Sequence, residues 1–387
     1  MIINHKYTPW ELCQFGVFDL MRFPLAILVI YIHCTIGIPE GPLNFENVLN
    51  IANMGILLRL YISKIISSMC VPTFFLISGY LLYYKQSSFN WIVFVRKLKR
   101  RFRSLVIPYF LWIFIYIFIT VLLMLGGSDS FLSWINSVVN YIRENGFLHI
   151  FYDSLVIETD PNYLPIGWKQ DHSTPILFTL WYIRDLIVAI LFSPVLYFAI
   201  RLFKGYFVLI MGIAFIFNLW PYIPGFSSIS IFFFSLGIYL SSHLKIMNLI
   251  LKQLNWFIVV GGSLLSFVCL YLFYANSPYY TYFIHTYSVI GVFFAIYVGW
   301  CSFNMGARPI SLLKNSAFFI YAAHMIFINR YCTLFVLTIL PYNNTLFGIL
   351  HYLLIPLAIT LVFLCCFWLC HKFSPHILSL LNGGRIQ

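Results

Sequence analysis

The stretch from Phe18 to Ile38, FDLMRFPLAILVIYIHCTIGI, decides how this chain can fold. It is apolar enough to enter a bilayer, yet it contains Arg22 and His33. An α-helix turns about 100° and rises about 1.5 Å per residue, so His33 falls on nearly the same face as Arg22, roughly 16 Å further along the axis. Ionisable groups in a membrane helix are costly and normally face a protein interior or a wet cavity. The stretch therefore predicts a membrane helix with one functional face.

A plainer interpretation fits either residue alone. Arg22 can mark the membrane boundary, because long basic side chains reach toward the headgroups. His33 can be a packing residue whose ring is satisfied by hydrogen bonds. The position of both residues on one face favours the functional interpretation.

The composition of the 387 residues is that of a membrane protein, with 61% hydrophobic and 9% charged residues. A soluble domain has about 25% charged residues. The apolar runs are long enough for helices, so we predict an all-α, polytopic membrane helical bundle that forms a single domain over residues 1–387. The excess positive charge sits in short loops, so nucleic acid is not an expected partner. We predict no metal site, because the cluster of Cys365, Cys366, Cys370 and His371 lacks a second pair of ligands.

About ten apolar runs are candidate membrane spans, at residues 20–38, 65–84, 105–125, 177–199, 206–219, 227–241, 256–274, 283–303, 316–338 and 347–370. With the N-terminus inside, sixteen Lys and Arg residues fall in inner segments and four in outer segments, namely Arg59, Lys64, Arg143 and Lys169. This bias predicts that both termini are cytoplasmic. Arg22 is then near the cytoplasmic surface and His33 near the outer one.

The longest loop, residues 126–174, lies outside in this topology and holds six of the eleven acidic residues. Long irregular loops are often functional, and acids mixed with aromatic residues suit sugar hydroxyls and ring faces. The loop is therefore either a lid over a site or an ordinary solvated connection. Residues 371–387 form a C-terminal tail.

A second signal is the basic segment from Lys85 to Trp112, which contains seven Lys and Arg residues just before the third span. Positive charge on the inner side anchors every such protein, but about two residues usually suffice. The excess predicts an anionic partner, either a phospholipid surface or a nucleotide-like phosphate group. Arg100, Arg101 and Arg103 are the main candidates, because arginine offers fork-shaped contacts to phosphate.

Two later spans also carry polar residues. Trp181 is followed one turn later by Arg184 and Asp185, an intramembrane pair that must face inward and be satisfied by partners. Tyr321 and His324 share one face of the ninth predicted span. Each of these residues is either a substrate contact or a structural support, and the pattern alone does not decide between the two roles.

The second span closes with PTFFLISGYLLYYK, in which Ser78 and Gly79 lie side by side. Small residues inside a membrane helix permit close helix packing, which is the main interpretation of this pair. Ser78 also counts among the candidate substrate or support residues.

These pieces together resemble the acyltransferase-3 family of bacterial membrane acyltransferases. The first span fits its Arg-x10-His pattern with Arg22 and His33, and PTFFLISGYLL is similar to its Phe-x3-Ser-Gly segment. RRFRSLVIPYFLW resembles its basic RxxR patch, filled by Arg100 and Arg103, although Arg101 can occupy the first position. LWYIRDLIV and FFIYAAH are similar to its Leu-Trp-Phe and Ile-Tyr-x-x-His segments. The chain resembles the stand-alone type without an SGNH domain.

The resemblance implies an enzyme of the bacterial cytoplasmic membrane. It would move an acyl group, expected to be acetyl, from cytoplasmic acetyl-CoA to a hydroxyl of a cell-envelope glycan or lipid-linked saccharide. Arg100, Arg101, Arg103 and Arg22 would hold the CoA phosphates. His33 would act as general base or acyl carrier, because its unperturbed pKa is near neutrality. Asp19 would orient Arg22.

The main alternative is a secondary transporter or flippase for an anionic or lipid-linked solute, which would use the same intramembrane charges. No pair of broken hydrophobic segments recurs at matching positions in two halves of the chain, which argues mildly against transport. A membrane sensor domain is a third interpretation.

Overall fold

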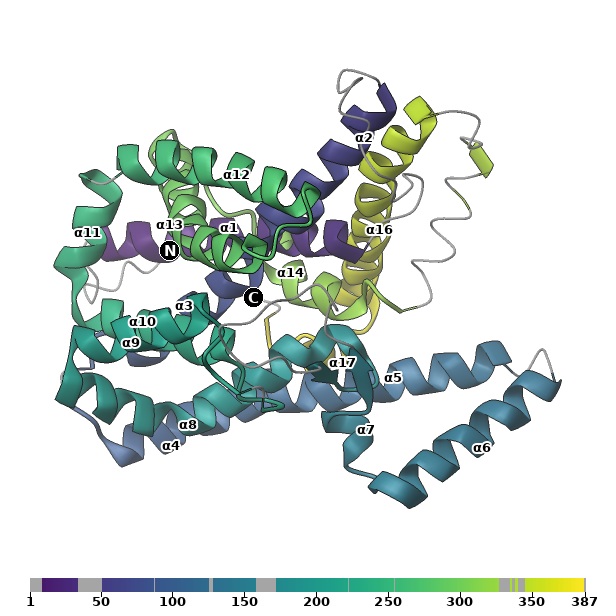
Figure 1. Cartoon of the computed structure of the whole chain (residues 1–387). Coiled ribbons are helices and arrows are strands. Elements are labelled where there is room, and N and C mark those ends of the chain that lie inside the picture. Colours follow the sequence, from purple (N-terminus) through teal and green to yellow (C-terminus); the bar gives the residue numbers. More distant parts are fainter. Residues whose placement is uncertain are drawn as a thin grey trace.

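The protein is built almost wholly from helices joined by short turns (Figure 1). The computed structural model describes residues 9–33, 51–86, 88–124, 128–157, 172–221, 223–253, 255–326, 335, 338–339 and 345–385.

In chain order, the first half of the structure contains α1 (Pro9–His33), α2 (Ile51–Leu60), η2 (Tyr61–Ile65), η3 (Ile66–Met69), α3 (Cys70–Tyr83), α4 (Trp91–Arg101), η4 (Phe102–Val106), α5 (Ile107–Met124), α6 (Ser128–Asn145), α7 (His149–Tyr152), β1 (Leu155–Ile157) and β2 (His172–Thr174). The second half contains η5 (Phe178–Leu180), α8 (Trp181–Phe203), α9 (Gly205–Ile216), α10 (Ser228–Ser242), α11 (Leu244–Lys252), η6 (Phe257–Gly261), α12 (Gly262–Tyr274), α13 (Tyr280–Asn304), α14 (Ser311–Ala323), α16 (Thr345–Phe373) and α17 (Pro375–Leu381).

Seven helical segments in the described ranges are long and apolar enough to cross a membrane: Cys13–His33, Asn53–Tyr83, Trp91–Leu122, Phe178–Phe203, Phe257–Tyr274, Tyr280–Asn304 and Leu346–Phe373. Two shorter apolar helices, α9 and α10, lie where the fifth and sixth spans are predicted. The ninth predicted span is described only in part, by α14. The polytopic all-α bundle is therefore confirmed, whereas the total of about ten spans stays a prediction.

The second span differs from its predicted bounds, because helix continues back from residue 65 to Ile51. Arg59 and Lys64, predicted in an outer loop, lie within this helical segment. They interrupt the apolar run in the sequence, which is why the pattern starts the span too late. Arg59 is only 3% exposed, so this basic side chain belongs to the packed interior rather than to a solvated loop.

The predicted irregular loop at 126–174 is also largely regular where the structure describes it. It forms α6, α7 and an antiparallel ladder in which Leu155 pairs with Thr174 and Ile157 with His172. Figure 1 shows α5 and α6 extending away from the other helices. Residues 158–171, which include Trp168, lie outside the described residues.

Helices α3 and α10 pack closely against each other, and two glycines permit the approach. A Cβ atom at Gly79 would lie 2.2 Å from the carbonyl oxygen of Phe234, and one at Gly237 would lie 2.1 Å from that of Leu76. No larger residue fits at either position without moving a backbone. The packing role predicted for the Ser78-Gly79 pair is therefore confirmed for Gly79.

Candidate functional site

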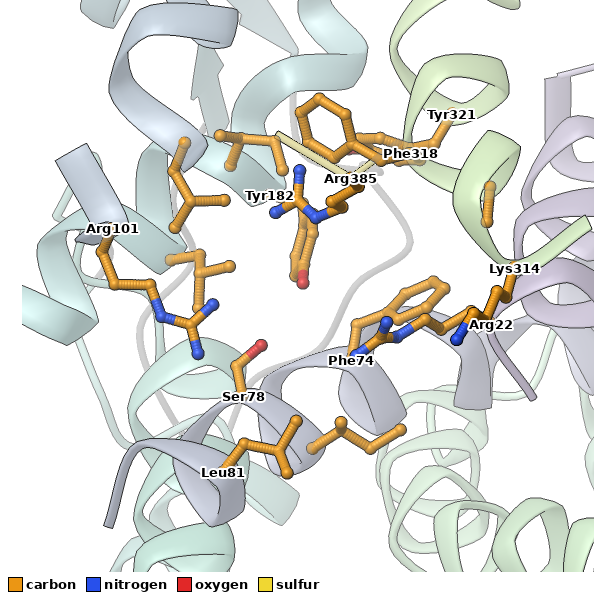
Figure 2. A pocket seen from close by; sticks show the side chains of 15 residues that line it. Arg22, Phe74, Ser78, Leu81, Arg101, Tyr182, Lys314, Phe318, Tyr321 and Arg385 are labelled. Atoms are coloured by element: carbon orange, nitrogen blue, oxygen red, sulfur yellow. The ribbon is translucent and has the colours of Figure 1, made fainter. Parts of the chain in front are cut away.

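A cavity opens where α1, α3, α8, α14 and the end of α4 meet the C-terminal segment (Figure 2). Its empty volume is about 770 Å³ with the open mouth included. The lining residues are Arg22, Phe74, Ile77, Ser78, Leu81, Arg101, Leu105, Tyr182, Ile183, Leu186, Lys314, Ala317, Phe318, Tyr321 and Arg385.

Four of these lining residues are cations and none is an acid. Asp19, one turn before Arg22, lies beside the cavity and shares its carboxylate between Arg22 Nη1 at 2.9 Å and Lys314 Nζ at 3.3 Å. The predicted orientation of Arg22 by Asp19 is thus seen in the structure. Among the described residues, no carboxylate forms an ion pair with Arg101 or Arg385. The cavity therefore carries excess positive charge and suits an anion.

Arg385 lies within electrostatic reach of two other cations of the cavity, Arg22 and Arg101. Burial first, and then the charges of Arg22 and Arg101, lower the pKa of the Arg385 guanidinium to about 9. Figure 2 shows these three guanidinium groups pointing toward the same space. A multiply charged anion between them would offset both the burial and the mutual repulsion.

Hydroxyl groups complete the polar lining. Ser78 and Tyr182 point into the cavity, as Figure 2 shows. The Tyr321 hydroxyl donates to the carbonyl oxygen of Thr179, which fixes the ring of Tyr321 in the wall. Ser78 and Tyr321 are thus predicted residues that the structure brings to one site.

A pair of histidines lies at the C-terminal end of α1, where His33 follows Arg22 by eleven residues. The ring of His33 has its centroid 5.3 Å from that of His324 and 5.1 Å from that of Phe178. His33 does not line the cavity, but His324 is one turn after Tyr321, which does. The ring centroids of Tyr321 and His324 are 6.1 Å apart, so the tyrosine joins the cavity wall to the histidine pair.

His324 is held so that one ring nitrogen stays available. Its Nδ1 lies 2.7 Å from the carbonyl oxygen of Tyr321, which can only accept a hydrogen bond. Nδ1 therefore carries the proton and Nε2 carries the lone pair. Nε2 is buried and has no hydrogen-bond partner within the described part of the chain.

The three arginines of the basic segment have different environments. Arg101 lines the cavity, whereas Arg100 and Arg103 are exposed on the outside of α4 and η4. Lys97 turns inward and donates to Gln86 Oε1 at 3.1 Å, which ties α4 to the end of the preceding span. Only one of the predicted phosphate-binding arginines in this segment therefore faces the cavity.

Arg184 and Asp185 form a buried structural pair. Arg184 Nη2 lies 2.9 Å from Asp185 Oδ1, and Nη1 donates to the carbonyl oxygens of Tyr152 at 2.6 Å and Ser173 at 2.9 Å. Ser227 donates to the second carboxylate oxygen at 2.5 Å. These contacts fasten α7 and β2 to α8, and α8 to the start of α10. The structure thus supports a structural role for this pair.

Trp181 is half-buried against the main hydrophobic core and does not line the cavity. The next residue, Tyr182, lines the cavity instead. Sequence reasoning also missed Lys314 and Arg385, which reach the cavity from distant parts of the chain. The turn signal Asn-Gly-Gly before Arg385 could have indicated a chain reversal there, but not its destination.

One of three comparisons with known proteins identifies a family for the chain. The family model described as an acyltransferase domain matches residues 15–371, which is nearly the whole chain. The comparisons with curated proteins and with solved structures gave no match. The match includes Arg22, His33, Ser78, Arg101, Tyr182 and His324. This multi-pass membrane protein is an acyltransferase and belongs to the acyltransferase-3 family.

Proposed function

We propose that the protein moves an acyl group, with acetyl as the first candidate, from cytoplasmic acyl-CoA to a hydroxyl of a cell-envelope glycan or lipid-linked saccharide. Its place would be the bacterial cytoplasmic membrane. The observation that carries the proposal is a cavity with three converging guanidinium groups beside the middle of α1 and a histidine pair at the C-terminal end of that helix.

The donor would bind with its phosphates in the cavity. CoA carries several phosphate charges, and charge-assisted hydrogen bonds from Arg22, Arg101 and Arg385 would hold them. From Arg22 to His33 the axis of α1 rises roughly 16 Å. The pantetheine arm is long and thin, so it would extend from the cavity along this helix and bring the thioester near His33.

The chemistry needs a base at the acceptor hydroxyl. His33 would take the hydroxyl proton while the acceptor oxygen attacks the thioester carbonyl carbon. The new C–O bond forms as the C–S bond breaks, and the CoA thiolate leaves with the proton that His33 then returns. His324 would act as a positioning residue, because its ring packs against that of His33 and is itself fixed by the Tyr321 carbonyl.

The test uses the purified full-length protein in lipid with acetyl-CoA labelled in the acetyl group. The expected result is label in an added envelope glycan or lipid-linked saccharide, together with release of free CoA. Movement of an anionic solute across the membrane without transfer of label would overturn the proposal and favour a transporter. Mass spectrometry of envelope glycans with and without the gene identifies the acceptor by an acetyl-sized difference.

A further inference from the structure

The chain makes a sharp hook after α17, formed by residues 382–385. Asn382 is fully buried and is followed by Gly383 and Gly384, whose φ angles are +62° and +78°. Residues with a side chain rarely adopt this left-handed backbone conformation. Two successive glycines adopt it easily and so permit the chain to reverse. The hook turns the chain back and directs Arg385 into the cavity, as Figure 2 shows.

The hook is fastened on three sides. Asn382 Nδ2 donates to the Asn315 carbonyl oxygen at 2.9 Å and to that of Arg385 at 2.7 Å. Trp112 Nε1 donates to the Leu381 carbonyl oxygen at 3.0 Å. The backbone of Ser104 lies so close that a Cβ atom at Gly383 would be 2.3 Å from its oxygen. These contacts join the C-terminal segment to η4, α5 and α14.

The same contacts set the position of the Arg385 side chain. Its guanidinium carbon lies 4.3 Å from the centre of the Phe318 ring, and its Nη1 donates to the Asn382 carbonyl oxygen at 3.0 Å. Ser104, against which the hook packs, follows Arg101 by less than one helical turn. The hook therefore brings Arg385 and Arg101 to one cavity, where like charges repel. A fold that concentrates three guanidinium groups without an acid in the lining is suited to a phosphate-bearing ligand.

We propose that the C-terminal hook is part of the donor site and that Arg385 binds a phosphate group of the acyl-CoA directly. This inference rests on the proposed function for the identity of the ligand. It assigns a role to a residue outside the segment that matches the family model, which ends at residue 371.

The test measures the affinity of coenzyme A for the full-length protein in lipid nanodiscs. R385Q is expected to weaken binding about tenfold or more, the effect of losing a charge-assisted hydrogen bond. R308Q is the matched control. Arg308 also stacks on a phenylalanine, Phe303 at 4.2 Å, and donates to nearby carbonyl oxygens, but it is exposed and outside the cavity. An R385Q affinity equal to that of R308Q would overturn the inference.

A second variant tests the hook itself. G383A keeps the Arg385 guanidinium group but disturbs the hook. Alanine is strained at the positive φ of residue 383, and its Cβ atom would clash with the Ser104 backbone. G383A should therefore weaken CoA binding as R385Q does. The melting temperature of the ligand-free R385Q protein should change little, while its increase on addition of CoA should shrink. A large loss of ligand-free stability with an unchanged CoA response would assign Arg385 a purely structural role.

The inference and the proposed function fail in different ways. CoA binding that depends on Arg385, without any acyl transfer, would contradict the function and keep the phosphate site. Acyl transfer with full CoA affinity in R385Q would contradict the site and keep the function.

Discussion

His33 and His324 lie against each other, with ring centroids 5.3 Å apart and ring planes tilted by 30°, although they belong to α1 and to the end of α14. Their contact brings together one residue of the first span and one of the ninth predicted span.

The first prediction concerns His33. H33A should lower the rate of acetyl transfer by about 10²–10⁴-fold, because a general base contributes that much. Its CoA affinity should stay within twofold of the wild type, since His33 does not line the cavity. A radiolabel transfer assay and a binding titration on the same preparation check both parts. Full transfer activity in this variant would remove His33 from the mechanism.

The second prediction concerns His324. Its contribution to catalysis should come from the Nε2 atom, and not from the hydrogen bond that Nδ1 donates to the Tyr321 carbonyl oxygen. H324A and H324N should both lower kcat and leave KM for acetyl-CoA nearly unchanged. Asparagine can still donate to the Tyr321 carbonyl oxygen, so a merely structural histidine would be rescued by H324N. Steady-state kinetics of the two variants separate these roles, and recovery of kcat in H324N would count against positioning.

The third prediction concerns Arg101, which lines the cavity while Arg100 and Arg103 do not. R101Q should weaken CoA binding about tenfold or more, through loss of a charge-assisted hydrogen bond in the cavity. R100Q and R103Q, which change exposed residues on the same segment, serve as controls of equal charge. Their affinities should differ from wild type by about twofold or less at physiological salt, where exposed charges are screened. Equal losses in all three variants would show a diffuse electrostatic effect.

The buried pair of Arg184 and Asp185 should contribute to stability. R184L leaves the Asp185 carboxylate buried without its cation, which typically costs about 3–5 kcal/mol. R201L changes an exposed arginine of the same helix and should stay within about 0.5 kcal/mol of wild type. Unfolding in lipid or mild detergent measures both. An R184L protein as stable as R201L would contradict the role assigned to this pair.

Gly79 tests the packing of α3 against α10. G79A should destabilise the protein by about 1–3 kcal/mol, as overpacking does, because the added Cβ would meet the Phe234 carbonyl oxygen at 2.2 Å. G261A is the control, since a Cβ atom there has nothing within 4 Å. It should be neutral or slightly stabilising, because alanine favours helix over glycine. The same unfolding measurement compares the two.

Part of this architecture follows from the sequence alone. The spacing of Arg22 and His33 places them on one helix face, and the structure adds that one lines the cavity while the other meets a second histidine. The pattern could not separate Arg101 from Arg100. Adjacent residues on a helix differ by about 100° in direction, and tertiary packing decides which of them faces inward.

Residues that reach the cavity by long chain reversals were the hardest to predict. Lys314 and Arg385 carry the charge that suits a phosphate, but nothing in their local sequence indicates which helices they will meet. Hydropathy also fails at Arg59, because a buried arginine inside a span resembles the start of a loop. These cases share one cause, since a contact between distant segments leaves no periodic signal in either of them.

The ladder between β1 and β2 has a practical consequence for experiments on the outer segment. Leu155 and Thr174 are paired, and Arg184 holds the carbonyl oxygen of Ser173, so the chain leaves and re-enters the bundle at two fixed neighbouring points. Lengthening a connection whose ends are already together costs little, about 0.6 kcal/mol for each doubling. An epitope or a fluorescent reporter inserted between Ile157 and His172 should therefore leave the bundle intact and reveal on which side of the membrane this segment lies.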